Sequence, residues 1–303
     1  MGFRIFAFTL LFCLSWLYGS NVSGKEGTDS RITGLPIPEL NEGVSLLTWN
    51  LQWFPGNSRT TTADAEEAQI KEVAAQLNET GAEIVCLQEV KGAGAVERLL
   101  ELLPGYRMQF VSDFSGALEI AIISRVDAVS AFAEEFEEAE ITPPRGFVYA
   151  AYDFDGHLLL VYSVHFKSNV GGIPASIPKR EESARQLLSH VEDAKRIHLT
   201  DGAKSVSVVL AGDFNTSLIA ENFVEDKTGA IILDSGFQWG FRGMVGEDLV
   251  TWLSDGRYPD VDFDHFFIRA SEGTIFGRSY VLPTERFVSD HRPVVMWLKM
   301  PEH

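Results

Sequence analysis

From Val44 onward, short apolar runs alternate with longer stretches in which apolar positions recur with helical spacing. The short runs are rich in β-branched and aromatic residues and are bounded by Gly, Pro, Asp or Asn, which indicates β-strands. Strands are predicted at 45–49, 84–88, 108–111, 119–124, 148–152, 158–165, 205–211, 265–269 and 293–299. Apolar residues at positions i, i+3 and i+4 predict helices over 62–78, 93–103 and 179–194.

Strands and helices intermingle along this part of the chain, with no second linker and no internal repeat of useful period. The pattern predicts one α/β catalytic domain over residues 41–303. Residues 25–40 contain several Gly, Ser and Thr residues and two prolines, so we expect a linker or loose N-terminal arm there.

The first residues of the chain form a separate apolar run. Arg4 precedes the apolar residues 5–18, and the small residues Gly19 and Ser20 follow before the chain turns polar. This order indicates a secretory signal peptide over residues 1–24. The run is shorter than the roughly 20 residues of a membrane-spanning helix, which argues against stable membrane insertion. We therefore expect a secreted or periplasmic protein, with an uncleaved N-terminal anchor as the alternative.

The composition is that of an ordinary globular protein, with 45% hydrophobic and 22% charged residues. The formal net charge is −18, and the chain has no basic run of any length. Proteins that hold nucleic acid by neutralising phosphates usually carry a basic face, so this charge is unfavourable for a polyanionic substrate. The most acidic segment, 134–140, is expected to be a solvated surface loop or helix.

Cys86 would be the only cysteine left after removal of the signal peptide, so no intramolecular disulfide is expected. It lies within an apolar run that is typical of a buried strand. A thiol in such a run behaves as a small hydrophobic side chain, and we predict that Cys86 belongs to the core.

Polar residues of the kinds that bind metals and phosphates recur at the ends of the predicted strands. They are Asn50, Glu89, His165, Asp213, Asn215, Asp264, Asp290 and His291. Each has an ordinary alternative explanation, because Asp, Asn and His side chains often satisfy free backbone groups where a strand gives way to a loop. Strand ends on one side of a stacked-sheet protein converge, however, so the repeated pattern predicts a common site.

Six short motifs contain these residues: TWN at 48–50, LQE at 87–89, SVHFKS at 163–168, GDFN at 212–215, FDHF at 263–266 and SDHRP at 289–293. The ordered set resembles the endonuclease/exonuclease/phosphatase superfamily, which includes secreted DNases, abasic-site endonucleases, sphingomyelinases and inositol-phosphate phosphatases. The resemblance implies a four-layer α/β sandwich of two packed, mostly antiparallel β-sheets flanked by helices. It also implies an enzyme that hydrolyses phosphodiester bonds with the help of a metal.

The resemblance implies a Mg²⁺ site held by Glu89 with help from Asn50 and Asp290, with Mn²⁺ or Ca²⁺ as alternatives. Oxygen ligands of this kind suit a hard cation that keeps several waters. The metal would polarise the phosphate and stabilise charge on the leaving oxygen.

The remaining motif residues are implied to act on water and phosphate. Asp213 would orient or deprotonate the attacking water, and Asn215 would hydrogen-bond a non-bridging phosphate oxygen. His291 would contact the phosphate, either as an imidazolium that stabilises the transition state or as a neutral base. Asp264 would fix the orientation of the His291 imidazole, and His165 would be a second phosphate-facing histidine.

Two further residues have less specific signals. Arg145 lies in the segment PPRG, where related proteins often have a phosphate-contacting Arg or Tyr, and an ordinary turn arginine is the alternative. Glu119 precedes a predicted strand and is either a partner of His165 or an ordinary exposed glutamate.

The substrate class is open between three functions. A nuclease, with nucleic acid as its partner, is favoured by the segment HFKSN at 165–169, which resembles a stretch common in DNase-like members. Such an enzyme would need divalent cations or a local basic patch, for which the candidates are Lys167, Lys179, Arg180 and Arg185. A lipid or small-molecule phosphoesterase is favoured by the acidic charge and by an apolar loop expected at 170–178. A non-enzymatic binding module is disfavoured, because no candidate position has lost its functional group. The sequence does not indicate the oligomeric state.

Overall fold

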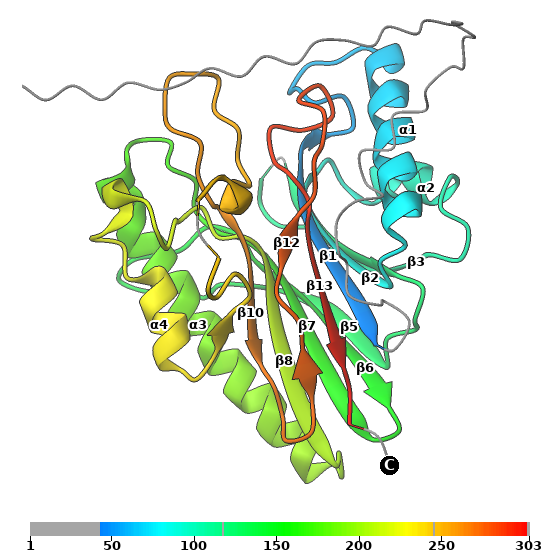
Figure 1. Cartoon of the computed structure of the whole chain (residues 1–303), viewed down its shortest axis with the longest axis vertical. Coiled ribbons are helices and arrows are strands. Elements are labelled where there is room, and N and C mark those ends of the chain that lie inside the picture. Colours follow the sequence, from blue (N-terminus) through cyan, green and yellow to red (C-terminus); the bar gives the residue numbers. More distant parts are fainter. Residues whose placement is uncertain (1–42, 117, 245, 302–303) are drawn as a thin grey trace, which may run out of the picture. The chain divides into compact units, whose positions relative to one another are not determined.

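The computed structural model of the chain describes residues 43–116, 118–244 and 246–301, which belong to one compact unit spanning Glu39–His303. The predicted signal peptide (1–24) and N-terminal arm (25–40) lie outside the described residues. Two β-sheets and four α-helices make up the described part of the chain (Figure 1).

The first sheet has seven strands. They are β1 (Val44–Phe54), β2 (Ile84–Val90), β3 (Arg107–Val111), β4 (Glu119–Ser124), β11 (Ile275–Phe276), β12 (Tyr280–Val281) and β13 (Val294–Lys299). The strand order is β11-β13-β1-β2-β4-β3, and β12 also pairs with β13. All pairs are antiparallel except β1 and β2, which helix α1 (Ala63–Thr80) connects as a crossover.

The second sheet has six strands. They are β5 (Ser130–Glu135), β6 (Gly146–Phe154), β7 (His157–His165), β8 (Ser205–Asp213), β9 (Gln238–Trp239) and β10 (Asp264–Arg269). The strand order is β5-β6-β7-β8-β10-β9. Here too one pair is parallel, because helix α3 (Ile173–Thr200) carries the chain from β7 to β8. The prediction of two mostly antiparallel sheets is confirmed.

The two sheets pack face to face, and helices cover their outer faces (Figure 1). Side chains of successive strand residues point to opposite faces, so each buried strand serves two apolar layers. In β1, Leu46 packs between the sheets, whereas Leu47 packs under α1 and α2 (Ala93–Leu100). Helices α3 and α4 (Thr228–Asp234) contact one another, and α3 covers the second sheet. The four-layer sandwich expected from the sequence is therefore present.

Local sequence signals account for the bounds of α1. The Thr62 side chain accepts a hydrogen bond from the backbone N–H of Ala65 and so caps the start of the helix. Gly81 ends it in the left-handed conformation at φ 63°, where a residue without a Cβ is favoured. Cys86 of β2 lies between the sheets as predicted, and burial raises the pKa of its thiol to about 12.

Some sequence-based expectations are wrong. Helix α3 begins at Ile173 rather than at 179, so most of the apolar loop expected at 170–178 is helix. Pro174 is compatible with this because a proline in the first turn replaces an N–H that has no partner there. The acidic segment 134–140 does not belong with these errors, because after the end of strand β5 it is an exposed loop as expected, and only its Phe136 is buried. Helix α4 and strands β5, β9, β11 and β12 were not predicted.

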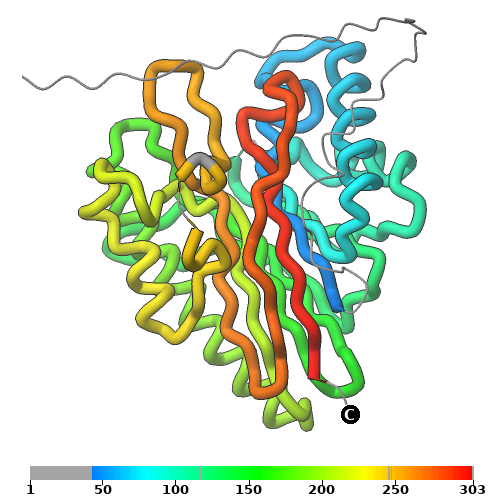
Figure 2. The backbone as a smooth tube through the Cα atoms, in the orientation of Figure 1, coloured from blue at the N-terminus to red at the C-terminus, as the bar shows by residue number. Residues whose placement is uncertain are grey.

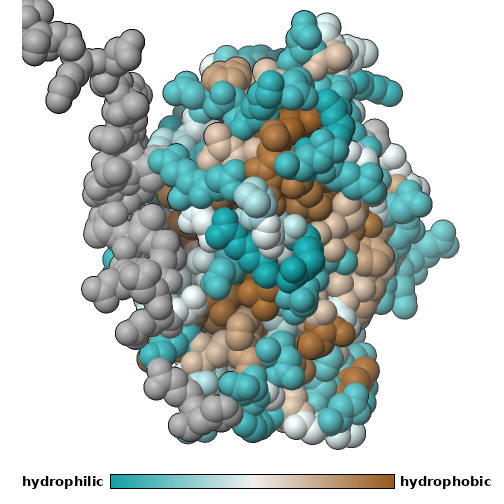
Figure 3. Space-filling view, turned by 90° about the vertical axis from the view of Figure 1, so that its right-hand side faces the viewer, coloured by the Kyte–Doolittle hydropathy of each residue, from teal (hydrophilic) through white to brown (hydrophobic). Residues whose placement is uncertain are grey.

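None of the helices in the described residues is long and apolar enough to cross a membrane. On the side of the molecule that carries α1 and α2, hydrophobic patches alternate with hydrophilic side chains (Figure 3). Mixed surfaces of this kind are ordinary for globular proteins, since polar groups never cover the whole surface.

Candidate active site

The predicted site residues converge at one end of the sandwich, which is the upper end in Figure 1. The parallel pairs β1–β2 and β7–β8 end there, and the antiparallel strands β10 and β13 begin there. In the second sheet, Asp213 is the register partner of both His165 and Asp264. The sheet pairing therefore brings together three side chains that are far apart in the sequence.

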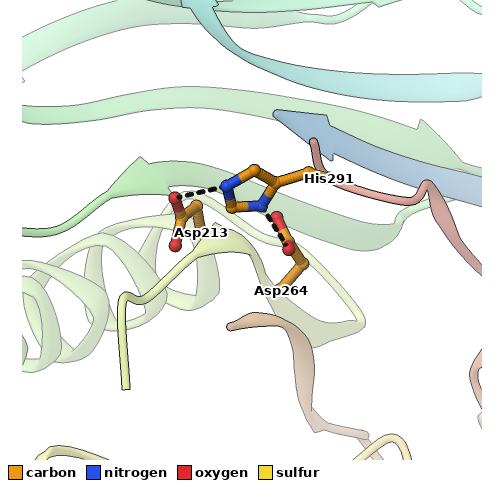
Figure 4. Close-up of side chains that lie close together, drawn as sticks. All are labelled: Asp213, Asp264 and His291. Atoms are coloured by element: carbon orange, nitrogen blue, oxygen red, sulfur yellow. Dashed lines mark hydrogen bonds and ion pairs between the residues drawn. The ribbon is translucent and has the colours of Figure 1, made fainter. Parts of the chain in front are cut away.

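His291 lies between two buried aspartates (Figure 4). Its Nδ1 forms a 2.7 Å hydrogen bond with Asp264 Oδ2, and its Nε2 lies 3.8 Å from Asp213 Oδ2. Burial alone would lower the pKa of His291, but Asp264 and Asp213 oppose this effect and raise the pKa to about 10. The geometry favours a cationic imidazole whose Nδ1–H is held by Asp264.

Backbone contacts hold this pair in place. Thr251 Oγ1 accepts hydrogen bonds from the backbone N–H groups of Phe263 and Asp264. Ser289 Oγ donates to the carbonyl of Asn50 and accepts from the backbone N–H of His291. Neither Thr251 nor Ser289 was predicted as a site residue. Ser289 lies inside the SDHRP motif, but Thr251 lies outside every motif.

Asp213 and Asn215 form a turn at the end of β8. The backbone N–H of Asn215 donates to Asp213 Oδ1, and Asn215 has a φ of 53°. The Asn215 amide Nδ2 donates to the carbonyl of Phe166. Burial raises the pKa of Asp213 to about 7, whereas the His291 charge acts to lower it. Asn215 is itself buried.

Asn50 links the two sheets at the site. Its Nδ2 donates to Asp213 Oδ2 at 2.9 Å and lies 3.4 Å from Glu89 Oε1. The other Glu89 oxygen accepts a hydrogen bond from the backbone N–H of Trp53. Glu89 is held with a positive φ of 60°, a conformation uncommon outside glycine that clusters at functional sites.

Asp290 lies beside this group on the segment that precedes β13. Its Oδ2 accepts a hydrogen bond from Trp252 Nε1, and its backbone N–H donates to Gln52 Oε1. Burial raises the pKa of Glu89, and the charge of Asp290 adds to this increase. Among the described residues, neither carboxylate forms an ion pair with a lysine or arginine.

The chemistry of these donors fits a divalent cation. Glu89 and Asp290 are neighbouring carboxylates that form no ion pair with a lysine or arginine of the described residues, and oxygen-rich sites of this kind suit hard cations. Asp213, Asp264 and His291 also offer ligand atoms within 4.8 Å of one another. In that second group, however, the Nδ1–Oδ2 hydrogen bond already joins His291 to Asp264. The predicted set of Glu89, Asn50 and Asp290 is therefore the better candidate.

His165 is buried at the end of β7. Its Nε2 lies 3.6 Å from Asp213 Oδ2 and 3.8 Å from Glu89 Oε1, and its Nδ1 has no hydrogen-bond partner. Burial, and then the nearby Arg145 charge, lower the pKa of His165 well below 6.5. The imidazole is therefore neutral and faces the acidic residues.

Arg145 supports the site through hydrogen bonds to the backbone at the end of β7. Its Nη1 donates to the carbonyls of His165 and Phe166 at 3.1 and 3.2 Å, and it has a φ of 66°. Burial lowers the pKa of Arg145, and the Glu89 and Asp213 charges oppose this effect. Glu119 does not pair with His165, because its Oε2 accepts hydrogen bonds from Ser112 Oγ and the Phe114 N–H.

The basic patch expected beside the site is wrong in part. Arg180 is buried, and its guanidinium pairs with Asp226 at 2.7 Å and donates to Asn169 Oδ1. Arg185 is exposed but forms ion pairs with two glutamates of its own helix. Lys167 Nζ donates to backbone carbonyls of its own loop. Most of these charges therefore act within the protein.

Sequence reasoning also missed Gln69 of α1. This buried amide donates to the carbonyls of Leu51 and Val288, and its oxygen accepts from the backbone N–H groups of Gly56 and Asn57. It thus joins the loop after β1 to the segment that carries Asp290. No local signal distinguishes Gln69 from other glutamines of an amphipathic helix.

A two-sheet α/β sandwich with acidic, amide and histidine side chains gathered at one end defines a class of hydrolases that act on phosphoester bonds. The sequence profile of the Endonuclease/Exonuclease/phosphatase family matches residues 47–291. The chain belongs to this family, and it is accordingly a phosphoester hydrolase. Enzymes of the family are typically dependent on divalent metals. No curated protein matches the chain in sequence.

Solved structures share the fold at low sequence identity. The crystal structure of D. rerio TDP2 humanized by 14 mutations has a TM-score of 0.64 and 17% identity, covering 85% of this chain and 99% of that one. D. rerio TDP2 complexed with a single strand DNA product has a TM-score of 0.58 and 17% identity, with coverages of 85% and 99%. The mannosyl-6-phosphatase Bt3783 of Bacteroides thetaiotaomicron VPI-5482 has a TM-score of 0.58 and 16% identity, with coverages of 84% and 99%.

Proposed function

We propose that the protein is an exported, Mg²⁺-dependent phosphodiesterase that cleaves nucleic acid in the manner of a DNase-like endonuclease. The His291–Asp264 pair facing Asp213, with Asn50 between Asp213 and Glu89, supports this chemistry. In this group of residues, His291 is a cation that can contact a phosphate, Asp213 is a carboxylate that can hold a water, and Glu89 provides acidic oxygens for a metal.

In this mechanism Asp213 orients the attacking water and accepts its proton as the water oxygen bonds to phosphorus, while the bond from phosphorus to the leaving ester oxygen breaks and that oxygen departs as the alcohol of the second product. The pKa of Asp213, raised to about 7 by burial, suits a base that works near neutral pH. The backbone N–H of Asn215 and the Asn50 amide hold the two carboxylate oxygens of Asp213. They thereby orient the carboxylate.

His291 acts on the negative charge of the phosphate. Its cationic imidazole donates from Nε2 to a non-bridging phosphate oxygen, while Asp264 holds Nδ1. The charge that develops on the phosphate during attack therefore meets a fixed donor, which is the arrangement that lowers a barrier most effectively. Neutral His165, which lies beside Asp213, and the Asn215 amide, which has a second N–H besides the one donated to Phe166, would complete the set of phosphate donors.

Glu89, Asn50 and Asp290 would hold the Mg²⁺. When bound there, the ion would polarise the phosphate and neutralise charge on the leaving oxygen. Trp53 N–H and Trp252 Nε1 each occupy one carboxylate oxygen and so fix the direction in which the acids point.

Two features support nucleic acid as the substrate. The segment HFKSN begins with His165, the last residue of β7, at the site, and it resembles a stretch of DNase-like proteins. D. rerio TDP2, which shares the fold, has been crystallised with a single strand DNA product. At 17% identity this likeness concerns the fold, so the substrate of TDP2 serves here only as a guide to the proposal.

A lipid or small phosphoester substrate is the second candidate, because apolar side chains lie exposed beside the site. Val170 is 81% exposed, and Ile219 is 54% exposed. The two loops that carry them are joined by a hydrogen bond from Asn169 Nδ2 to the carbonyl of Asn215. An apolar edge at the mouth of the site suits contact with a lipid surface.

The test compares product release from plasmid DNA, sphingomyelin vesicles and bis-p-nitrophenyl phosphate, each with Mg²⁺ and with EDTA. Magnesium-dependent nicking of plasmid is expected from the wild type and not from Asp213→Ala or His291→Ala. His157→Ala changes a histidine at the opposite end of β7 and is the matched control, with wild-type activity expected. Lipid head-group release with intact plasmid would favour the second candidate function, hydrolysis of a lipid or small phosphoester. Near-normal nicking by either site variant would refute the mechanism.

Export is tested separately. Mature protein recovered outside the cytoplasm should begin after the first 24 residues, as N-terminal sequencing would show. A protein that keeps its first residues and stays with the membrane would instead support the uncleaved anchor.

A further inference from the structure

Of the aromatic residues that the structure describes, two have side chains that are exposed to solvent. They are Tyr258, which is 67% exposed, and Phe287, which is 58% exposed. Single exposed apolar residues are common on protein surfaces and need no explanation. The position of these two is what distinguishes them.

The loops at 253–260 and 283–290, to which these two residues belong, lie at the end of the sandwich that holds the candidate active site (orange and red loops at the top of Figure 2). Tyr258 belongs to the loop closed by the bridge between Trp252 and Val261, and Phe287 lies three residues before Asp290. Trp252 Nε1 donates to Asp290 Oδ2, and the Leu253 N–H donates to the Asp290 carbonyl. The two loops therefore meet at a proposed metal ligand.

Hydrogen bonds tie these loops to one another and to the body of the protein. Arg286 Nη1 donates to the carbonyls of Leu253 and Ser254 at 2.6 and 2.7 Å. Asn57 Nδ2 donates to the carbonyl of Phe287 at 3.0 Å. The aromatic side chains thus stand on an anchored support, which reduces the entropy lost when they bind a ligand.

Charge in these loops is balanced rather than basic. Arg257 forms an ion pair with Asp255 at 2.6 Å, and the Arg286 guanidinium contacts backbone carbonyls. The whole chain has a net charge of −18. Neutralisation of phosphates therefore offers little affinity for a nucleic acid strand, whereas stacking of bases on aromatic rings requires no net charge.

We propose that Tyr258 and Phe287 form an aromatic rim on which unpaired bases of a single-stranded nucleic acid stack while its backbone enters the active site. This inference rests on the proposed nuclease function and adds a preference for single strands. Duplex DNA keeps its bases stacked inside the helix, so it cannot use the rim in this way.

Binding is measured first, with a fluorescent oligothymidine in the Asp213→Ala background, where the strand stays intact. Adding Tyr258→Ala or Phe287→Ala should raise the dissociation constant about tenfold, within the range known for loss of one stacked base. Tyr258→Phe should bind like the parent because it keeps the ring. Ile275→Ala, at an equally exposed apolar position on β11, is the matched control and should have no effect.

Turnover is measured second, in the otherwise wild-type enzyme. Tyr258→Ala and Phe287→Ala should lower kcat/KM for the oligonucleotide about tenfold and leave hydrolysis of bis-p-nitrophenyl phosphate unchanged. Equal losses on both substrates, or no loss on either, would overturn the rim.

The outcomes separate this inference from the proposed function. If neither aromatic substitution changes oligonucleotide cleavage, the proposed nuclease function is retained and the proposed aromatic rim is rejected. Hydrolysis of the small ester alone, with no binding of oligothymidine, would remove the nucleic acid substrate and the rim together. Binding to sphingomyelin vesicles that depends on Phe287, without oligonucleotide binding, would assign the exposed aromatics to a lipid surface.

Discussion

At the scale of single residues, the site depends on how one imidazole is held. Asp264 accepts the hydrogen bond from His291 Nδ1 and is itself aligned by its backbone contact with Thr251. The opposite nitrogen faces Asp213, and in the proposed mechanism it would also meet the phosphate. Asp264 is therefore a positioning residue, because it acts through His291.

Asp264→Asn should lower kcat about 10- to 100-fold with little change in KM, because it keeps the size of the side chain and removes the charge that favours the imidazolium. Steady-state kinetics on a small phosphodiester measure both constants. The alkaline limb of the pH–rate profile should also move to lower pH, since the pKa of His291 loses its principal support. Wild-type kcat with an unchanged profile would show that Asp264 does not act through His291.

At the scale of elements, helix α3 positions the loop that follows β7. The buried Arg180 guanidinium donates to the Lys167 carbonyl and to Asn169 Oδ1, and Asn169 in turn donates to the carbonyl of Asn215. Asp226 supplies the opposite charge from the segment before α4. The Arg180–Asp226 ion pair thus connects α3 and the segment before α4 to the turn formed by Asp213 and Asn215.

Arg180→Met should destabilise the protein by about 3–5 kcal/mol, because Asp226 would remain as a buried charge without a partner. Chemical denaturation followed by tryptophan fluorescence measures the free energy of unfolding. The double variant Arg180→Met/Asp226→Leu removes both charges and should recover part of the loss. If the single and double variants are equally unstable, packing rather than charge accounts for the effect.

The same helix carries a titratable contact with the second sheet. His190 Nδ1 hydrogen-bonds with the Tyr162 hydroxyl, and burial lowers the pKa of His190 below 6.5. The unfolded chain therefore takes up this proton more readily than the folded one. Stability from this contact is complete above pH 6.5 and falls as the pH drops toward the lower folded-state value.

His190→Asn should accordingly lose less stability than the wild type between about pH 7 and about pH 5. Thermal unfolding of both proteins across this range measures the difference. An identical pH dependence in the two proteins would mean that other groups, such as His198 with its own lowered pKa, dominate the acid sensitivity.

At the scale of the whole molecule, the net charge of −18 opposes approach of a polyanion. Most nucleic-acid enzymes lose affinity as salt rises, because phosphate contacts release counterions. In this protein salt also screens a repulsion between substrate and enzyme, which acts over about a Debye length of 10 Å at 0.1 M.

The KM for single-stranded DNA should therefore fall or stay level as NaCl rises from low to moderate concentration at constant free Mg²⁺. Initial rates at several salt concentrations provide the slope, and bis-p-nitrophenyl phosphate is the control with little dependence. A steep increase of KM with salt would instead indicate several phosphate contacts that the folded protein supplies from residues outside the site.

The four-layer arrangement was implied by the resemblance of the ordered motifs to a known family. By itself, the pattern of residues determined the α/β class, the burial of Cys86 and the strand ends on which the site stands. These properties follow from local patterns, because strands and helices differ in the spacing of apolar residues and polar groups collect where strands end. The start of α3 was missed because Pro174 and Pro178 are loop signals. Pro174 lies in the first turn, where a helix tolerates proline, whereas Pro178 lies inside the helix.

Only the tertiary structure decided which polar groups meet. Arg180, a candidate surface cation in the sequence, is buried against Asp226, and Gln69 donates to the carbonyl of Val288, which lies 219 residues further along the chain. Contacts of this kind depend on how two sheets and their crossover helices pack, and no local spacing encodes them. The sequence thus specified the chemistry present at the site, and long-range packing specified its geometry.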